Sequence, residues 1–208
     1  GWGMRNGITT SWMGGVNGAF TLCDGDMDLG GNYLYNGSNT YVEERSTKET
    51  FKDDGSSLIY NSDGYSRNRS DGHRFGVRLD HKFSDATSIL FQPQFSFGRG
   101  SFDDFSADTT LTKNVDGSRE IANKGFTRNL GQNQSLSASG FLLFRQRLGK
   151  PGRTISTMFR YDISKNSLDG FNHSSSTATG ADPEMVNQRF DRLSTGTTLS
   201  GRLVYTEP

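Results

Sequence analysis

The residues best suited to bind a metal ion are carboxylates near the N-terminus. Asp24, Asp26 and Asp28 have the alternating spacing with which a calcium-binding EF-hand loop begins. Such a loop needs glycine at its sixth position and glutamate at its twelfth, but Leu29 and Tyr35 occupy those positions. The Asp-Gly-Asp stretch is therefore predicted to be a hairpin turn, because Asp-Gly is a favoured hairpin dipeptide.

The other chemically reactive residues form no recognisable catalytic or metal-binding motif. His73, His81 and His173 are too far apart in the sequence for a short metal-ligand spacing. The serines do not occur in a Gly-x-Ser-x-Gly elbow, and the glycines do not form a phosphate-binding loop with a following lysine. We therefore expect no enzymatic activity, no bound metal and no cofactor.

The stretch from Arg74 to Phe97 has the clearest pattern of alternating residues. From Phe75 to Phe83 every second residue is mostly apolar, and the residues between them are mostly charged. The alternation resumes from Ile89 to Phe97, after a short polar break. A period of two indicates β-strands, and each run is close to the ~9–11 residues of a tilted membrane-spanning strand. The pattern predicts the wall of a β-barrel with an apolar outside and a polar inside.

The composition supports the same interpretation. Hydrophobic residues make up only 31% of the chain, yet 12% of the residues are aromatic, a content that argues against disorder. In a transmembrane barrel only every second strand residue faces lipid, so a low hydrophobic content is expected. The chain has 23 basic and 23 acidic residues, so its charge gives no reason to expect nucleic acid as a partner.

The residues of the polar face are expected to point into the lumen of the barrel. One interpretation is a ladder of ion pairs, in which Arg78 or Arg160 pairs with acids on neighbouring strands. The other is a polar surface that contacts a plug or a passing solute. The lumen-facing candidates are Arg74, Arg78, Asp80, Lys82, Gln92, Gln94, Arg145, Arg147, Arg160, Asp162 and Arg202.

The residues of the apolar face are expected to contact outer-membrane lipid. Its aromatic residues near the two borders would form the interfacial girdles of such a barrel. The membrane-facing aromatic candidates are Trp12, Phe20, Tyr33, Tyr35, Phe75, Phe83, Phe91, Phe95, Phe97, Phe144, Phe159, Tyr161 and Tyr205.

The predicted connections alternate between short and long. Short turns are predicted near residues 24–26, 84–86 and 149–152, and long polar outer loops near 46–70, 102–129 and 166–188. This rhythm is typical of outer-membrane barrels, which have tight periplasmic turns and long outer loops. We therefore predict an all-β fold for residues 1–208, an antiparallel up-and-down meander of about seven strands within one transmembrane β-barrel.

Three stretches carry a resemblance to a known family. They are the glycine-rich strand Trp12–Phe20, the aromatic strand Gly31–Asn36 and the closing segment Leu203–Pro208. With them the chain resembles the barrel region of TonB-dependent-receptor-like outer-membrane proteins related to SusC. The resemblance implies solute uptake across the bacterial outer membrane. The implied partners are outer-membrane lipid, the remainder of the barrel, a plug domain where the parent chain has one, and an unknown solute.

Two other interpretations stay open. A small eight-stranded structural or adhesive barrel would need residues near Trp2 to Ile8 to pair with Leu199 to Tyr205. A soluble β-sandwich that binds carbohydrate would need the face with Phe75 and Phe91 to pack on a second sheet.

Overall fold

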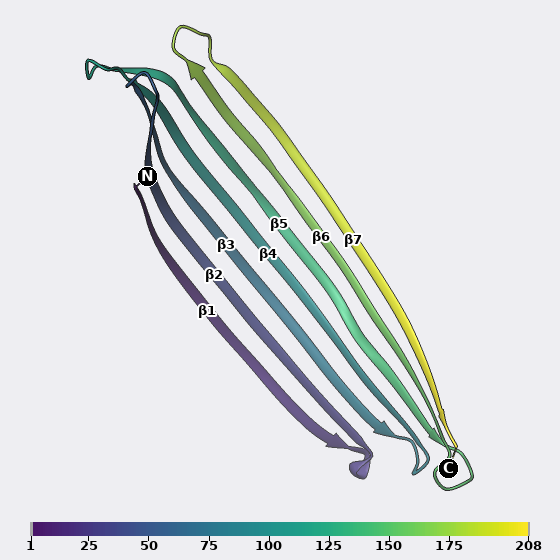
Figure 1. Ribbon diagram of the computed structural model, residues 1–208. Helices are drawn as coiled ribbons and strands as arrows, with labels where there is room; N and C mark the ends of the chain where they lie inside the picture. Colours follow the sequence, from purple (N-terminus) through teal and green to yellow (C-terminus); the bar gives the residue numbers. More distant parts are fainter. Residues whose placement is uncertain (1, 208) are drawn as a thin grey trace.

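The computed structural model describes residues 2–207, which form a single antiparallel sheet with strands in the order β1-β2-β3-β4-β5-β6-β7 (Figure 1). Each strand pairs with its neighbours in the sequence, so the predicted all-β, up-and-down meander is confirmed. The strands are β1 (Trp2–Leu22), β2 (Met27–Phe51), β3 (Ser57–Lys82), β4 (Thr87–Lys113), β5 (Arg119–Arg147), β6 (Thr154–Ala178) and β7 (Glu184–Thr206), with the short 3-10 turn η1 (Cys23–Gly25) between β1 and β2.

The strands are much longer than the sequence predicts. They contain between 21 and 29 residues, whereas a tilted strand needs only about 9–11 to cross a membrane. The prediction of long outer loops near 46–70, 102–129 and 166–188 is wrong. These stretches continue the strands and are joined by tight turns near Gly55, Gly117 and Gly180.

Polar and aromatic contacts between strands explain why these stretches pair. Serine hydroxyls of Ser38 and Ser70 lie 2.8 Å apart, and the Thr47 hydroxyl donates to the Asn61 side chain over 2.9 Å. Farther along, stacked rings join Tyr41, Tyr65, Phe105 and Phe126 across β2 to β5. Cross-strand pairs of these kinds can stabilise a sheet that has no apolar face. Strands held in this way lack apolar periodicity, so that pattern cannot reveal them.

The turns lie at two opposite ends of the sheet. The first end, named here the Gly25 end, has the turns after β1, β3 and β5, where short turns were predicted. The second, the Gly55 end, has the turns after β2, β4 and β6. At Gly55 and at Gly117 the backbone φ is positive, +84° and +83°, and the preceding aspartate accepts a hydrogen bond from the following serine in both turns.

The register divides the side chains between two faces. Phe75 pairs directly with Tyr33 and with Phe95, and paired residues of an antiparallel ladder lie on the same face. This face is named the Phe75 face. The opposite one, the Arg74 face, has Arg74 paired with Leu34 and Ser96.

The sheet is a single open layer. β1 and β7 are its two edges and do not pair with each other, so the closure required for a self-contained eight-stranded barrel is not formed (Figure 1). Within residues 2–207 there is also no second sheet against which the Phe75 face could pack, as a sandwich would require. In the same range, the chain has no helix of the length and apolar character needed to span a membrane.

Removing one ring from the aromatic ladder tests the extended strands. Tyr65 lies 6.2 Å from Tyr41 and 5.6 Å from Phe105 between ring centroids, and each aromatic pair is worth about 0.5–1.5 kcal/mol. We expect Tyr65→Ala to speed hydrogen exchange of the backbone amides of residues 57–70, because cross-strand support is lost. Tyr60→Ala on the opposite face of β3 is the matched control. Fast exchange of these amides in the unmodified chain would contradict the extended strands.

Candidate functional site

The main surface feature is an apolar band on the Phe75 face. It is defined by the rows from Leu22–Met27 to Gly14–Tyr35, which continue across the sheet to β7. On β4 the band runs from Ile89 to Phe97, close to the about 9–11 residues of a membrane-crossing strand. Beyond it, toward the Gly55 end, the same face carries charged side chains such as Asp71 and Arg99.

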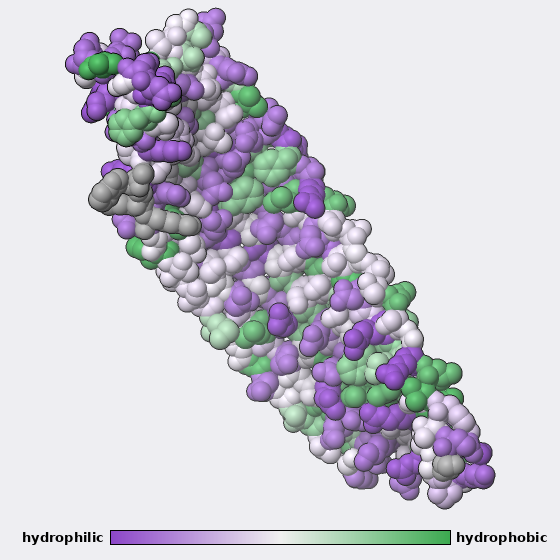
Figure 2. Space-filling view, in the orientation of Figure 1, coloured by the Kyte–Doolittle hydropathy of each residue, from purple (hydrophilic) through white to green (hydrophobic). Residues whose placement is uncertain are grey.

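The side chains of the band are exposed. Phe20 is 65% exposed, Phe75 47% and Leu203 66%. Figure 2 shows one face of the sheet, on which hydrophilic and hydrophobic residues are intermixed along the strands. Of the apolar side chains that the structure describes, only Ile59, Leu90 and Pro93 are buried. An exposed apolar patch of this extent marks a surface that contacts a membrane or another protein.

The membrane-facing aromatic candidates all belong to this face. The ladder pairing gives Trp12, Phe20, Tyr33, Tyr35, Phe75, Phe91, Phe95, Phe97, Phe144, Phe159, Tyr161 and Tyr205 the same face, and Phe83 follows β3 directly. Their contact with lipid remains a prediction.

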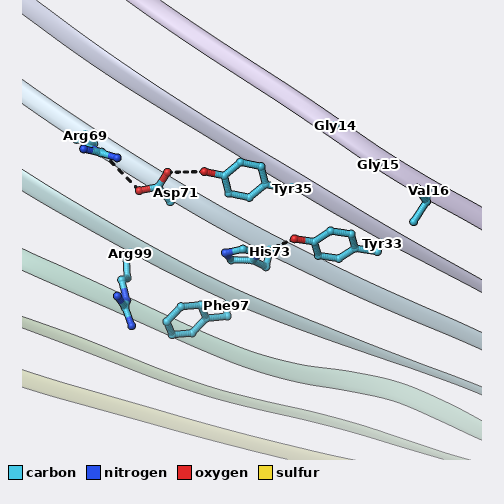
Figure 3. A pocket seen from close by; sticks show the side chains of 10 residues that line it. All are labelled: Gly14, Gly15, Val16, Tyr33, Tyr35, Arg69, Asp71, His73, Phe97 and Arg99. Atoms are coloured by element: carbon cyan, nitrogen blue, oxygen red, sulfur yellow. Dashed lines mark hydrogen bonds and ion pairs between the residues drawn. The ribbon is translucent and has the colours of Figure 1, made fainter.

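A shallow hollow of about 760 Å³ lies at the border where the band meets the charged region (Figure 3). Its floor is aromatic: it includes Tyr33, Tyr35 and His73, and the His73 ring lies 6.0 Å from the Tyr33 ring and 5.0 Å from the Tyr35 ring. Gly14 leaves open space beside it, since an added Cβ there would meet nothing within 4 Å. The floor can therefore accept an apolar chain.

Polar groups line the other side of the hollow. The Tyr35 hydroxyl donates to Asp71 over 2.9 Å (Figure 3). Outside the lining, Trp12 Nε1 donates to the same hydroxyl over 3.2 Å. Arg69 lies 3.6 Å from Asp71, and the Arg99 guanidinium lies 5.4 Å from the centre of the Phe97 ring. The combination of an aromatic floor with guanidinium groups at the rim suits an amphiphile such as a lipid with an anionic head group.

Sequence reasoning missed the polar half of this hollow. Arg69, Asp71 and Arg99 were not among the predicted site residues, and His73 was considered only as a metal ligand. They continue the period of two on β3 and β4 past the last apolar residue. That continued period would have assigned them to the Phe75 face.

The lumen-facing candidates all lie on the Arg74 face. The register gives this face Arg74, Arg78, Asp80, Lys82, Gln92, Gln94, Arg145, Arg147, Arg160, Asp162 and Arg202. The expected ladder of ion pairs between strands is not formed. Arg78 lies 3.6 Å from Asp80 on its own strand, and Arg160 has no ion pair among the described side chains.

A bidentate ion pair joins β4 and β5 beyond the band. Nε and Nη2 of Arg128 each donate to an oxygen of Asp103 over 2.9 Å. These hydrogen bonds and the positive charge of Arg128 hold the pKa of the Asp103 carboxyl below its usual range, although partial burial opposes the effect. The same pair raises the pKa of Arg128.

The described residues offer no site for a metal. Within residues 2–207 no cluster of histidine, cysteine and acidic side chains has the arrangement to hold an ion. Asp24 forms part of the 3-10 turn at the Gly25 end, where it has a positive φ of 55°.

The comparisons with known proteins do not identify a family. No family model matches the chain, and no curated protein matches it. In solved structures, the chain is 9% identical to Pseudomonas aeruginosa OpdQ, with a TM-score of 0.11 over 98% of this chain and 97% of the other. It is 9% identical to Haemophilus ducreyi BamA lacking POTRA domains 1–3, with a TM-score of 0.11 over 97% of this chain and 71% of the other. Likenesses this weak carry no argument about fold or function, which must be inferred from the chain's own residues.

The contact between Trp12 and Gly37 can be tested by adding one methyl group. A Cβ at Gly37 would lie 2.4 Å from the Trp12 indole, whereas one at Gly14 meets nothing within 4 Å. We expect Gly37→Ala to displace the indole and shift tryptophan fluorescence, because the end of the Trp12 side chain must move to make room for the methyl group. Gly14→Ala is the control. Equal spectra for the two variants would contradict this contact.

The Asp103–Arg128 pair predicts a pH dependence. Because the folded-state pKa of Asp103 is depressed, the pair stabilises the sheet above the ordinary aspartate pKa of about 3.9 and this stabilisation is lost as the pH falls through the folded-state value. We expect Asp103→Asn to lower the unfolding free energy at neutral pH by at most about 1 kcal/mol, the upper end for exposed pairs. In strong acid the variant and the unmodified chain should unfold alike.

Thermal unfolding at the two pH values measures this difference. Asp104→Asn, on the opposite face of β4, removes the same charge without breaking an ion pair among the described residues. A loss in Asp104→Asn equal to that in Asp103→Asn would argue against the pair.

Proposed function

We propose that this chain forms part of the wall of a β-barrel in the bacterial outer membrane, with the Phe75 face toward lipid and the Arg74 face toward the lumen. The observation that carries the proposal is the apolar band of the Phe75 face, which contrasts with the mostly polar Arg74 face, whose apolar exceptions include Leu90, Phe141 and Leu143. The band spans about as many residues as a membrane-crossing strand, and its side chains are exposed. The opposite face of the same strands carries Arg74, Lys82 and Arg145, which lie in no ion pair among the described side chains.

The borders of the band support this orientation. Trp12, Tyr33 and Tyr35 lie on the side of the Gly55 end, and Tyr205 and Phe83 lie at the Gly25 end. Aromatic side chains with a polar group favour the interface between lipid and water, where outer-membrane barrels have their girdles. The tight turns at the Gly25 end would then face the periplasm. The long strand extensions toward the Gly55 end would project outward from the cell.

The open edges indicate what must complete the wall. In lipid every backbone amide and carbonyl needs an internal partner, so β1 and β7 require further strands beside them. We propose that the remainder of a larger barrel supplies these strands. A plug domain would then contact the Arg74 face where the parent chain has one.

We also propose a TonB-dependent type of solute uptake as the function of that larger barrel. The proposal rests on the resemblance carried by Trp12–Phe20, Gly31–Asn36 and Leu203–Pro208. Arg74, Lys82 and Arg145 of the Arg74 face, which have no ion pair among the described side chains, support it, because a wet lumen can hold charges that a packed core cannot.

The membrane proposal predicts that folding depends on detergent. The chain should show β-structure by circular dichroism and a discrete size when refolded with detergent micelles, and should aggregate without them. Without detergent the apolar band would stay exposed to water, and exposed apolar patches of this size promote aggregation. A folded monomer in plain buffer would overturn the proposal and favour a soluble binding module.

Two adjacent substitutions on β4 sharpen the experiment. Phe95→Arg introduces a charge into the band, at a cost of about 2–4 kcal/mol near the bilayer midplane, whereas Gln94→Arg introduces it on the Arg74 face. We expect the first variant to fold poorly in micelles and the second to fold like the unmodified chain. Equal losses in the two variants would show that the faces do not differ in environment.

A further inference from the structure

A second hollow, of about 620 Å³, lies on the Arg74 face at the Gly25 end. Lys82 of β3 and the pair Arg145 and Arg147 of β5 line it, and each of these three side chains is exposed. Its lining also includes the hydroxyl-bearing residues Ser88 and Ser156. Cations and hydroxyl groups are together the usual protein partners of phosphate and carboxylate oxygens.

The cations of this hollow are not neutralised by the protein. Among the described side chains, Lys82, Arg145 and Arg147 lie in no ion pair. One acid, Asp85, contributes to the lining. Cations therefore outnumber acids at the hollow.

Two more unpaired arginines extend the positive surface toward the edge of the sheet. In the strand register Arg202 lies opposite Met158 and Arg160 lies opposite Ser200. Both arginines are therefore on the Arg74 face, within a few rows of Arg145. With strands about 4.8 Å apart and a rise of about 3.4 Å per residue, the Cα atoms of Arg145, Arg160 and Arg202 are separated by roughly 8–14 Å. That spacing suits several anionic groups on one molecule better than a single ion.

We propose that this hollow binds a small molecule that carries at least two phosphate or carboxylate groups. Arg145 and Arg147 would each hold one anionic group in bidentate fashion. Lys82 would attract the molecule as a point charge. The hydroxyls of Ser88 and Ser156 would donate further hydrogen bonds to it. The inference deepens the proposed function, because a role of this site in transport rests on the chain being part of a barrel wall. If the Arg74 face lines a lumen, the solute meets a positive surface at the periplasmic end of its path.

The experiment titrates sodium tripolyphosphate into the full chain folded in zwitterionic micelles and follows binding by isothermal titration calorimetry. We expect saturable binding that weakens as salt is added, because ions screen exposed charges. Arg145→Gln combined with Arg147→Gln should weaken binding at least about tenfold, because two charge-assisted contacts are lost. Lys82→Gln, on a different strand, should weaken it by a smaller factor.

A charge-matched control lies on the other face. Arg67→Gln combined with Arg189→Gln also removes two positive charges, and both residues lie over aromatic rings of the Phe75 face, outside either hollow. This variant should bind tripolyphosphate within about twofold of the unmodified chain, since its contacts are distant from the hollow. Equal weakening in both double variants would overturn the proposal by showing that only net charge matters.

The result separates this proposal from the proposed function. Folding that requires micelles, together with no tripolyphosphate binding, would overturn the anion site alone. Folding in plain buffer, together with binding that depends on Arg145 and Arg147, would overturn the membrane proposal and uphold the site. Where a double variant does not fold by circular dichroism, Lys82→Gln decides the matter, because unchanged binding in that variant would overturn the site.

Discussion

The register of the antiparallel ladder is the constraint on which the other features depend. Side chains alternate between faces with a period of two, so a slip of one residue in a strand would move its whole apolar set to the other face. In this sheet Phe20, Leu29, Leu79, Phe91, Leu142 and Phe159 form one continuous row across six strands. The band and the positive hollow are therefore two consequences of one pairing pattern.

Apolar periodicity was sufficient to predict the part of the fold that forms the band. Phe75 to Phe83 and Ile89 to Phe97 alternate so regularly that both strands and the turn between them followed from the sequence. The extension toward the Gly55 end could not be predicted in this way. Its strands are held by hydroxyl pairs, stacked rings and ion pairs such as Arg45–Asp63, whose partners are distant in the sequence.

Turn dipeptides show the same limit. Asp54-Gly55 forms a turn, while the identical dipeptide Asp63-Gly64 lies inside β3, where Asp63 binds Arg45 of the neighbouring strand. The surroundings decide between the two outcomes, because an extended glycine is tolerated where another backbone approaches closely. An added Cβ at Gly64 would lie 2.3 Å from the carbonyl oxygen of Phe105 in β4. The close approach of β4 therefore requires glycine at this position of β3. The sequence shows the dipeptide but not the neighbour.

The length of the strands has a mechanical consequence. On β5 the stretch from Arg119 to Ser135 continues beyond the band, a distance of roughly 55 Å at about 3.4 Å per residue. Along this length neighbouring strands stay paired, so the extension is one continuous sheet rather than a set of separate loops. A force applied at the Gly55 end would therefore pass along hydrogen-bonded strands to the apolar band.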